Sequence, residues 1–118
     1  MVLTTLLIVV LAHHSAAATY DAARVEVVRG VVASFAWRNP HCHVYISVTE
    51  GEFSGRLFNV ELGSPLALAQ AGWTKSRLLP GDRIEISVLP ARSGAPAGLC
   101  RDCPLRVERP GSPAPHPH

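Results

Sequence analysis

The chain has 118 residues, of which 47% are hydrophobic, and a formal net charge of +2. This length suits one domain with a single core. The 11 Lys and Arg residues are scattered along the chain rather than gathered into a basic stripe, which argues against nucleic acid as a partner.

The first segment, residues 1–12, is predicted to be a signal peptide. Its apolar run is far shorter than the roughly 20 residues of a membrane-spanning helix, and it ends in the small residue expected before a cleavage site. Cleavage after Ala12 would release a periplasmic or secreted chain that starts at His13 and has no membrane span. The alanines at 16–18 allow a later cut, which would remove both His13 and His14.

Residues 25–37 predict a long first strand. Period-two alternation places four apolar residues on one face of it: Val31, Ala33, Phe35 and Trp37. Gly30 in its middle favours a bulge or a sharp coil, which lets one strand serve both sides of a small barrel. The following turn is predicted from Arg38-Asn39-Pro40, because proline fixes its own φ and disfavours helix in the residue before it.

The second strand is predicted over residues 42–49, with Val44, Ile46 and Val48 in the buried phase. The opposite face then carries His41, His43, Tyr45 and Ser47, so the two histidines are expected to be neighbours. After a polar hairpin loop, a third strand is predicted with Phe58, Val60 and Leu62 inward and Asn59 and Glu61 outward.

A short helix is predicted next, with Ser64 as N-cap, Pro65 at the first helical position and Gly72 as the stop. Leu66 and Leu68 are expected to plug the core.

A fourth strand follows the Pro80-Gly81-Asp82 turn, with Ile84, Ile86 and Val88 on one face and Arg83 on the other. Residues 99–108 are a weaker candidate for a fifth strand. The resulting order, β-β-β-α-β-β, predicts an all-β, OB-fold-like five-stranded barrel over residues 13–108, followed by a disordered Pro/His tail over 109–118.

Five motifs together resemble a family of short exported bacterial proteins of unknown function. They are His13-His14-Ser15, the Trp37 to His41 turn, the Glu61 to Pro65 segment, Ala71-Gly72-Trp73, and Leu79 to Asp82. The resemblance spans nearly the whole mature chain and implies export and a small OB-like barrel, but no established activity. The position of His43 is usually aromatic or apolar in that family, and the three cysteines are particular to this chain.

The candidate metal ligands are His13 with its α-amine, His14 and His41, with His43 or Glu61 as additional ligands. Imidazole and amine nitrogens suit copper(II) best and zinc next. In the alternative interpretation, His13 and His14 belong to a flexible terminus and His41 caps the turn by bonding the backbone.

Cys100 and Cys103 form a C-x-x-C motif. A redox site is disfavoured, because no βαβ setting or helix start surrounds the motif, and a zinc site would need further ligands such as Cys42 and a histidine. In an exported chain a local disulfide, or free thiols in a loop, is the favoured interpretation. The tail pair His116 and His118 is interpreted as a solvated tail.

No nucleophile elbow, carboxylate pair or phosphate loop is present, so the chain is predicted to be non-enzymatic. The leading hypothesis is a periplasmic OB-like module that binds copper, or less readily zinc, through the mature amino terminus and His41. The alternative is a metal-free interaction module that binds a protein, a glycan or a small ligand on an outer face around Tyr45, Asn59, Glu61 and Arg83.

Overall fold

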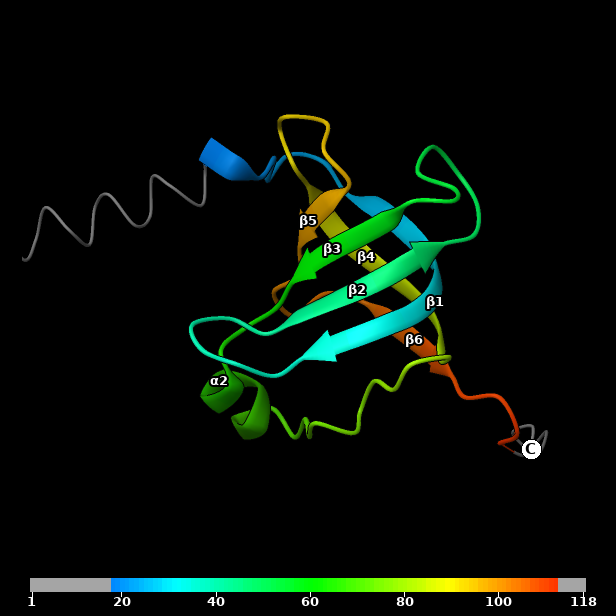
Figure 1. The fold of residues 1–118 in the computed structure, drawn as a ribbon. Coiled ribbons are helices and arrows are strands. Elements are labelled where there is room, and N and C mark those ends of the chain that lie inside the picture. The colour runs from blue at the N-terminus through cyan, green and yellow to red at the C-terminus, as the bar shows by residue number, and fades with distance from the viewer. Residues whose placement is uncertain (1–17, 113–118) are drawn as a thin grey trace, which may run out of the picture.

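The computed structural model describes residues 18–112. Its secondary structure consists mainly of six strands and the short helix α2, which are drawn in Figure 1. They are β1 (Glu26–Ala36), β2 (His43–Val48), β3 (Leu57–Glu61), α2 (Pro65–Gln70), β4 (Arg83–Pro90), β5 (Ala97–Leu99) and β6 (Leu105–Glu108).

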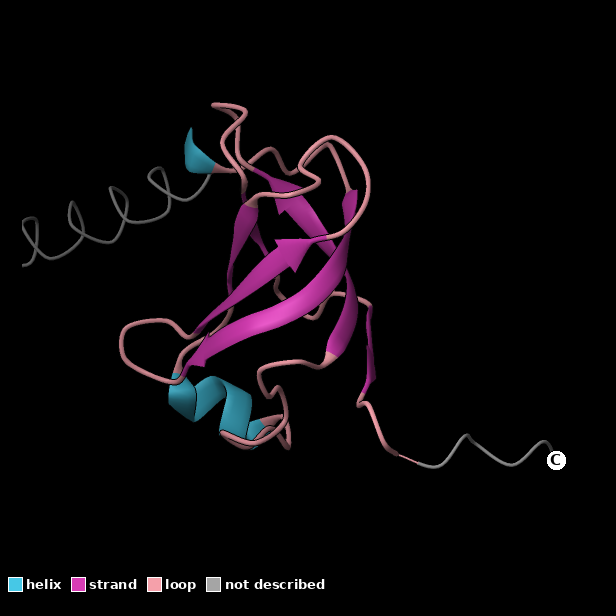
Figure 2. Cartoon of the chain, turned by 45° about the vertical axis from the view of Figure 1, so that its right-hand side comes forward, coloured by secondary structure: helices cyan, strands magenta, loops and turns pink. Residues whose placement is uncertain are grey.

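Five of the strands form a closed barrel, and Figure 2 shows how the sheet curves round on itself. Neighbouring strands follow the order β1-β2-β3-β5-β4, and β4 pairs again with β1. The β3–β5 pair is parallel and the other pairs of the barrel are antiparallel. This closed barrel with its short helix after β3 confirms the predicted OB-like fold. The strand β6 is an addition, paired only with β4.

The predicted fifth strand is divided in two. β5 has three residues and pairs with both β3 and the end of β4, whereas β6 pairs with the first half of β4. Between them the chain makes a tight loop in which Asp102 has a φ of 49°, and Pro104 has no N–H to donate to a ladder. A continuous strand over residues 99–108 was therefore the wrong expectation.

β1 passes through both halves of the barrel, and Gly30 lies where the two ladders meet. Gly30 pairs with Val48 on one side and with Ile84 on the other. A Cβ at this position would fall on the backbone carbonyl oxygen of Ser47, so the crossing needs glycine.

The bulge lies three residues after Gly30. The register between β1 and β2 shifts between Val32 and Ser34, which leaves Ala33 as the extra residue. The extra residue reverses the inward phase, so Val28 and Val32 are buried before it, while Phe35 and Trp37 pack against the core after it. The expectation that Val31 and Ala33 share a face with Phe35 and Trp37 was wrong for this reason.

The core lies inside the barrel and comes mainly from alternating residues of four strands. Its fully buried members include Val32, Val44, Ile46, Phe58, Val60, Ile86 and Val88. α2 lies at the end of the barrel where β1 stops and β2 starts (Figure 1). The Ser64 hydroxyl accepts the Ala67 N–H at 3.1 Å as the predicted N-cap.

Only one of the two helix leucines plugs the barrel. Leu68 is buried, whereas Leu66 is 68% exposed. Residues two apart in a helix point to opposite sides, so both could not face the core. Gly72 has a φ of 90° just after the helix, in keeping with its predicted role as the stop.

The end of β6 is fastened by a buried carboxylate. The Asp82 side chain is 2% exposed and accepts two hydrogen bonds from the Arg109 guanidinium, each of 2.9 Å, and one from the Leu79 N–H at 2.9 Å. Arg109 also donates to the carbonyl oxygen of Ser76 at 3.2 Å. Arg109, which the sequence analysis assigned to the tail, is thus bonded to the start of β4. Within residues 18–112, no helix has both the length and the apolar character to cross a bilayer.

Candidate functional site

Four polar or aromatic side chains form the outward face of the β2–β3 hairpin. His43 is the register partner of Glu61, and Tyr45 is the register partner of Asn59. Their neighbours Val44, Ile46, Phe58 and Val60 are fully buried, so the pleat turns these four residues outward. We refer to His43, Tyr45, Asn59 and Glu61 as the β2–β3 face.

Both histidines of this region are held by β3 through the same ring nitrogen. His43 Nδ1 lies 2.8 Å from Asn59 Oδ1, and His41 Nδ1 lies 3.3 Å from Glu61 Oε1. The Asn59 carbonyl oxygen only accepts hydrogen bonds, so His43 Nδ1 carries the proton and donates it. The Glu61 carboxylate lies close enough to His41 Nδ1 to favour a proton on that nitrogen as well. The His41 ring therefore pairs with a side-chain carboxylate, whereas the alternative interpretation had it bonding the backbone of the turn.

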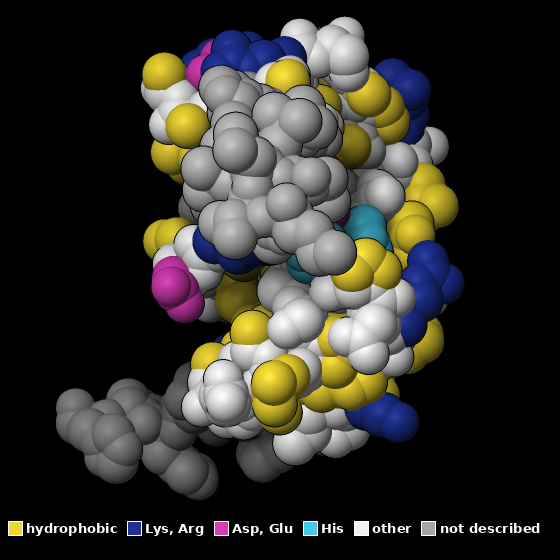
Figure 3. Space-filling view, turned by 90° about the vertical axis from the view of Figure 1, so that its left-hand side faces the viewer, with side chains coloured by type: hydrophobic (Ala, Val, Ile, Leu, Met, Phe, Trp, Pro, Cys, Tyr) yellow, Lys and Arg dark blue, Asp and Glu magenta, His cyan; other side chains and the backbone are white. Residues whose placement is uncertain are grey.

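The second nitrogen of each ring is left open. Among the described residues, neither Nε2 has a hydrogen-bond partner. A neutral ring that is protonated at Nδ1 presents a lone pair at Nε2, which is the form that binds a metal ion. The His41 side chain is 41% exposed, and Figure 3 shows histidine side chains at the surface on this side of the molecule. The His43 ring also stacks on Tyr45, with the centroids 6.2 Å apart.

Two residues that the sequence analysis did not single out surround Glu61. Arg101 Nη2 lies 3.7 Å from Glu61 Oε2, on the far side of the carboxylate from His41. The pKa of Tyr20 is raised, mainly because the phenol is partly buried and also because the negative charge of Glu61 is near. Neither residue belongs to the periodic pattern of β2 or β3, so no pattern in the sequence would place it beside Glu61.

The start of the described chain is fastened beside this cluster. Tyr20 forms an isolated antiparallel bridge with Ala91. Next to it, the Asp21 N–H donates to the Pro90 carbonyl and the Arg92 N–H donates to the Thr19 carbonyl, both at 2.9 Å. These bonds direct the amino-terminal segment along the end of β4 and the loop before β5.

His13 and His14 lie outside the described residues. His14 precedes Tyr20 by six positions, and six extended residues span at most roughly 20 Å. In residues 18–112, no group of three or more His, Cys, Asp or Glu side chains could hold a metal ion. The metal site predicted from the sequence therefore depends on His13 and His14 for the rest of its ligands.

The three cysteines are not part of the β2–β3 face. Cys100 and Cys103 are joined in a disulfide, one of the two alternatives that the sequence analysis left open, and Cys42 is a fully buried free thiol. Cys42 points into the barrel between two outward histidines, so it does not share their face. The C-x-x-C loop follows directly on the β3–β5 pairing, because the Cys100 N–H donates to the Glu61 carbonyl at 2.9 Å.

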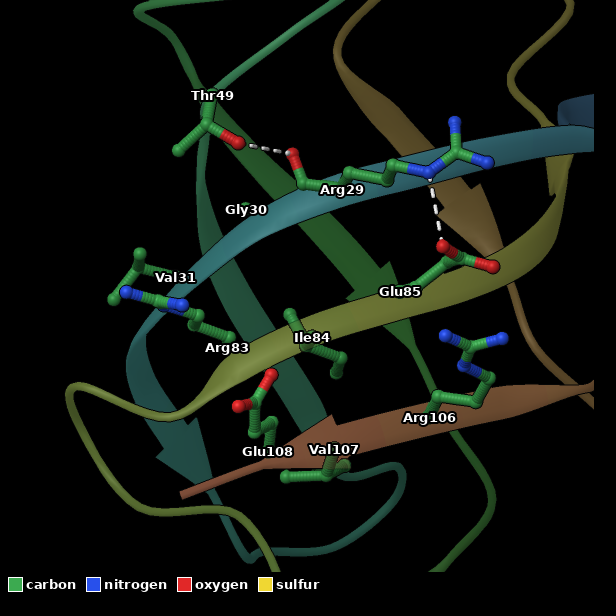
Figure 4. Close-up of a pocket in the computed structure, with 10 residues that line it drawn as sticks. All are labelled: Arg29, Gly30, Val31, Thr49, Arg83, Ile84, Glu85, Arg106, Val107 and Glu108. Carbon is green, nitrogen blue, oxygen red and sulfur yellow. Dashed lines mark hydrogen bonds and ion pairs between the residues drawn. The ribbon is translucent and has the colours of Figure 1, made fainter. Parts of the chain in front are cut away.

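Arg83 does not join the predicted ligand face. It lies on β4, where its register partners are Val31 of β1 and Glu108 of β6. Here the outer wall carries a hollow of about 340 Å³ (Figure 4). Arg29 lines the hollow and donates a hydrogen bond from Nε to Glu85 Oε2 at 2.9 Å. Tyr45 and Asn59 are thus on one part of the barrel wall and Arg83 is on another.

One protein family matches the chain over most of its length. The model of a family of unknown function, DUF6152, matches residues 2–101. The chain belongs to this family. Among curated proteins and among solved structures there is no significant match. The part matched to DUF6152 contains His13 and His14, the whole β2–β3 face and, at its end, Arg101.

Proposed function

We propose that this DUF6152 protein is an exported, non-enzymatic module that binds a transition metal ion, copper(II) in preference to zinc(II). The ligands are the α-amine and imidazole of His13, His14 and the imidazole of His41. Amine and imidazole nitrogens follow the affinity order that places copper(II) above zinc. The role is capture or delivery of the ion in the periplasm or outside the cell.

One observation carries this proposal: the chain enters the barrel beside the carboxylate that holds His41. The bonds of residues 19–21 to residues 90–92 fasten the entering segment, and Glu61 is near enough to Tyr20 to affect its pKa. A terminus that starts at His13 lies only a few residues upstream of this point. The reach of those residues supports a site shared between the terminus and His41.

The residues around His41 support its role as a ligand. The Glu61 carboxylate lies 3.3 Å from His41 Nδ1, which leaves Nε2 for the metal, and a carboxylate beside the second ring nitrogen is common around metal-bound histidines. Arg101 contacts the other oxygen of Glu61 and so holds the carboxylate in place. In this arrangement Glu61 orients a ligand and is not itself one.

The test is a copper(II) titration of exported protein with its native amino terminus, followed by calorimetry or electron paramagnetic resonance. We expect one tight copper per chain, and His41→Ala should weaken binding at least 10-fold. His116→Ala is the matched control, because it removes a histidine that lies at the other end of the chain. Equal affinity of the His41→Ala variant and the unchanged protein contradicts the proposal.

The hollow beside Arg83 supports a second candidate function, a metal-free module that binds a protein, a glycan or a small ligand. Arg83 and Arg106 line this hollow, and neither guanidinium has a partner among the described residues. If this function is the correct one, Arg83→Ala lowers capture of the periplasmic partner in a pull-down and His41→Ala leaves it unchanged. If His41→Ala lowers the capture and Arg83→Ala leaves it unchanged, this second function is excluded.

A further inference from the structure

The β2–β3 face points to metal binding by the barrel itself. We infer that His41 and His43 form a two-imidazole metal subsite on the barrel wall, with Glu61 and Asn59 as the positioning residues that leave both Nε2 atoms free for the ion. The inference rests on the proposed function, because it concerns ligands of the same site. It goes beyond the proposed function because His41 and His43 on the barrel wall bind a metal ion without help from the amino terminus.

Both histidines contact side chains of β3. His43 lies opposite Glu61 in the β2–β3 register, and its Nδ1 is hydrogen-bonded to Asn59, two residues earlier on β3. The Leu62 N–H donates to the Cys42 carbonyl and the Cys42 N–H to the Gly63 carbonyl, so the two chains stay paired beyond the end of β2 towards His41. His41 Nδ1 lies 3.3 Å from Glu61 Oε1. Both rings therefore turn Nδ1 towards β3.

The spacing of the pair suits a shared ion. Residues two apart in a strand are separated by roughly 7 Å along the chain and point to the same side. Cys42 between them is fully buried, which fixes His41 and His43 on the outside. Two imidazole rings on the same side at this spacing can both reach one ion that lies between them.

The contacts at Nδ1 also determine which neutral form of each ring is favoured. In a free neutral histidine the proton mostly occupies Nε2, where it blocks that nitrogen as a ligand. Asn59 Oδ1 accepts a hydrogen bond from His43 Nδ1, which leaves the lone pair on Nε2, and the Glu61 carboxylate beside His41 Nδ1 favours the same form. Such partners also raise the basicity of the ligand nitrogen and typically contribute 10- to 100-fold to metal affinity.

The test uses the full exported chain without its terminal histidines and zinc(II) as the probe. The background variant carries four substitutions, all outside the described residues: His13→Ala, His14→Ala, His116→Ala and His118→Ala. Proton–nitrogen correlation spectra of the imidazoles report the protonated nitrogen of each ring, and calorimetry gives the zinc affinity. We expect Nδ1–H forms for His41 and His43, and zinc-induced shifts at their Nε2 atoms.

Three substitutions in this background distinguish a loss of ligand or of ligand orientation from a general effect on the fold. We expect His43→Ala to abolish zinc binding, and Asn59→Leu to weaken it about 10-fold while His43 returns to the Nε2–H form. Ser47→Ala, which alters an exposed residue of the same strand, should change neither measurement.

Two outcomes overturn the inference. They are the absence of zinc binding in the background variant, and zinc binding that His43→Ala leaves intact. Either can occur while copper still binds the native terminus, in which case the proposed function stands and the wall subsite does not. Conversely, the background variant can bind zinc while the protein with its native terminus binds copper no more tightly. That result would remove the proposed function and leave the wall subsite.

Discussion

At the scale of single residues, Asp82 is the one charged side chain that is buried in the described part of the chain. Its pKa is lowered from the ordinary value of 3.8, chiefly by the hydrogen bonds from Arg109, which outweigh the opposing effect of burial. The pairing joins the start of β4 to the residue after β6. It therefore ties the added strand to the barrel.

Asp82→Asn should lower the free energy of unfolding by about 2 kcal/mol at neutral pH, because it removes charge-assisted hydrogen bonds from a buried group. The folded-state pKa is lowered, so this stabilisation is present above the unfolded-state pKa and is lost as the pH falls through the folded-state value. Urea unfolding from pH 7 downward should show the variant and the unchanged protein converging below pH 3.8. Glu52→Gln, at an exposed loop position, is the control. A difference that is independent of pH would show that the carboxylate charge is not the cause.

At the scale of elements, β1 depends on the absence of a side chain at its crossing point. Gly30→Ala would place a methyl group on the Ser47 carbonyl oxygen, and the backbone of two ladders would have to move. We expect a loss of about 2 to 3 kcal/mol in urea unfolding. Gly63→Ala is the matched control, because its Cβ would find ordinary contacts of 3.5 Å and longer. If the Gly30→Ala and Gly63→Ala variants had the same stability, the close contact between position 30 and the Ser47 carbonyl oxygen would be contradicted.

The loop between β5 and β6 makes a separate prediction about the cysteines. Thiol counting should find no reactive thiol in the native protein, because Cys42 is buried and Cys100 and Cys103 are paired. One thiol should react after unfolding without reductant, and three after reduction. Closing so short a loop contributes about 2 kcal/mol to stability, and a Cys100→Ser, Cys103→Ser double variant should lose that amount. Three reactive thiols in unfolded, unreduced protein would mean that the disulfide does not form.

The strands that alternate cleanly were predictable from sequence, and the irregular ones were not. In β2, β3 and β4 every second residue is apolar, so the pattern located both the core and the outward histidines. In β1 the bulge at Ala33 reverses the phase, and a one-residue insertion is invisible to a strict period of two. The division of the last strand depends on a loop closed by the disulfide, which local propensity does not report.

At the scale of the whole molecule, the site joins segments far apart in the chain. Sequence alternation placed His41, His43, Asn59 and Glu61 on one wall, because they belong to one hairpin. Arg101 and Tyr20 reach Glu61 only through barrel closure, by the parallel β3–β5 pairing and the bridge of Tyr20 to Ala91. Closure also separates Arg83 from Tyr45, although alternation gives both an outward direction. Sequence alternation determines which side of its strand a residue faces, and barrel closure determines where around the barrel that residue lies.

The most direct test of the account is a native mass spectrum of the protein recovered from the periplasm after growth with copper. One spectrum reports the processed terminus and the bound metal together. We predict a chain that begins at His13, lighter by two hydrogen atoms for the disulfide, with one copper ion retained. A chain that begins after His14, or a chain that begins at His13 and carries no copper, would contradict the proposed metal site.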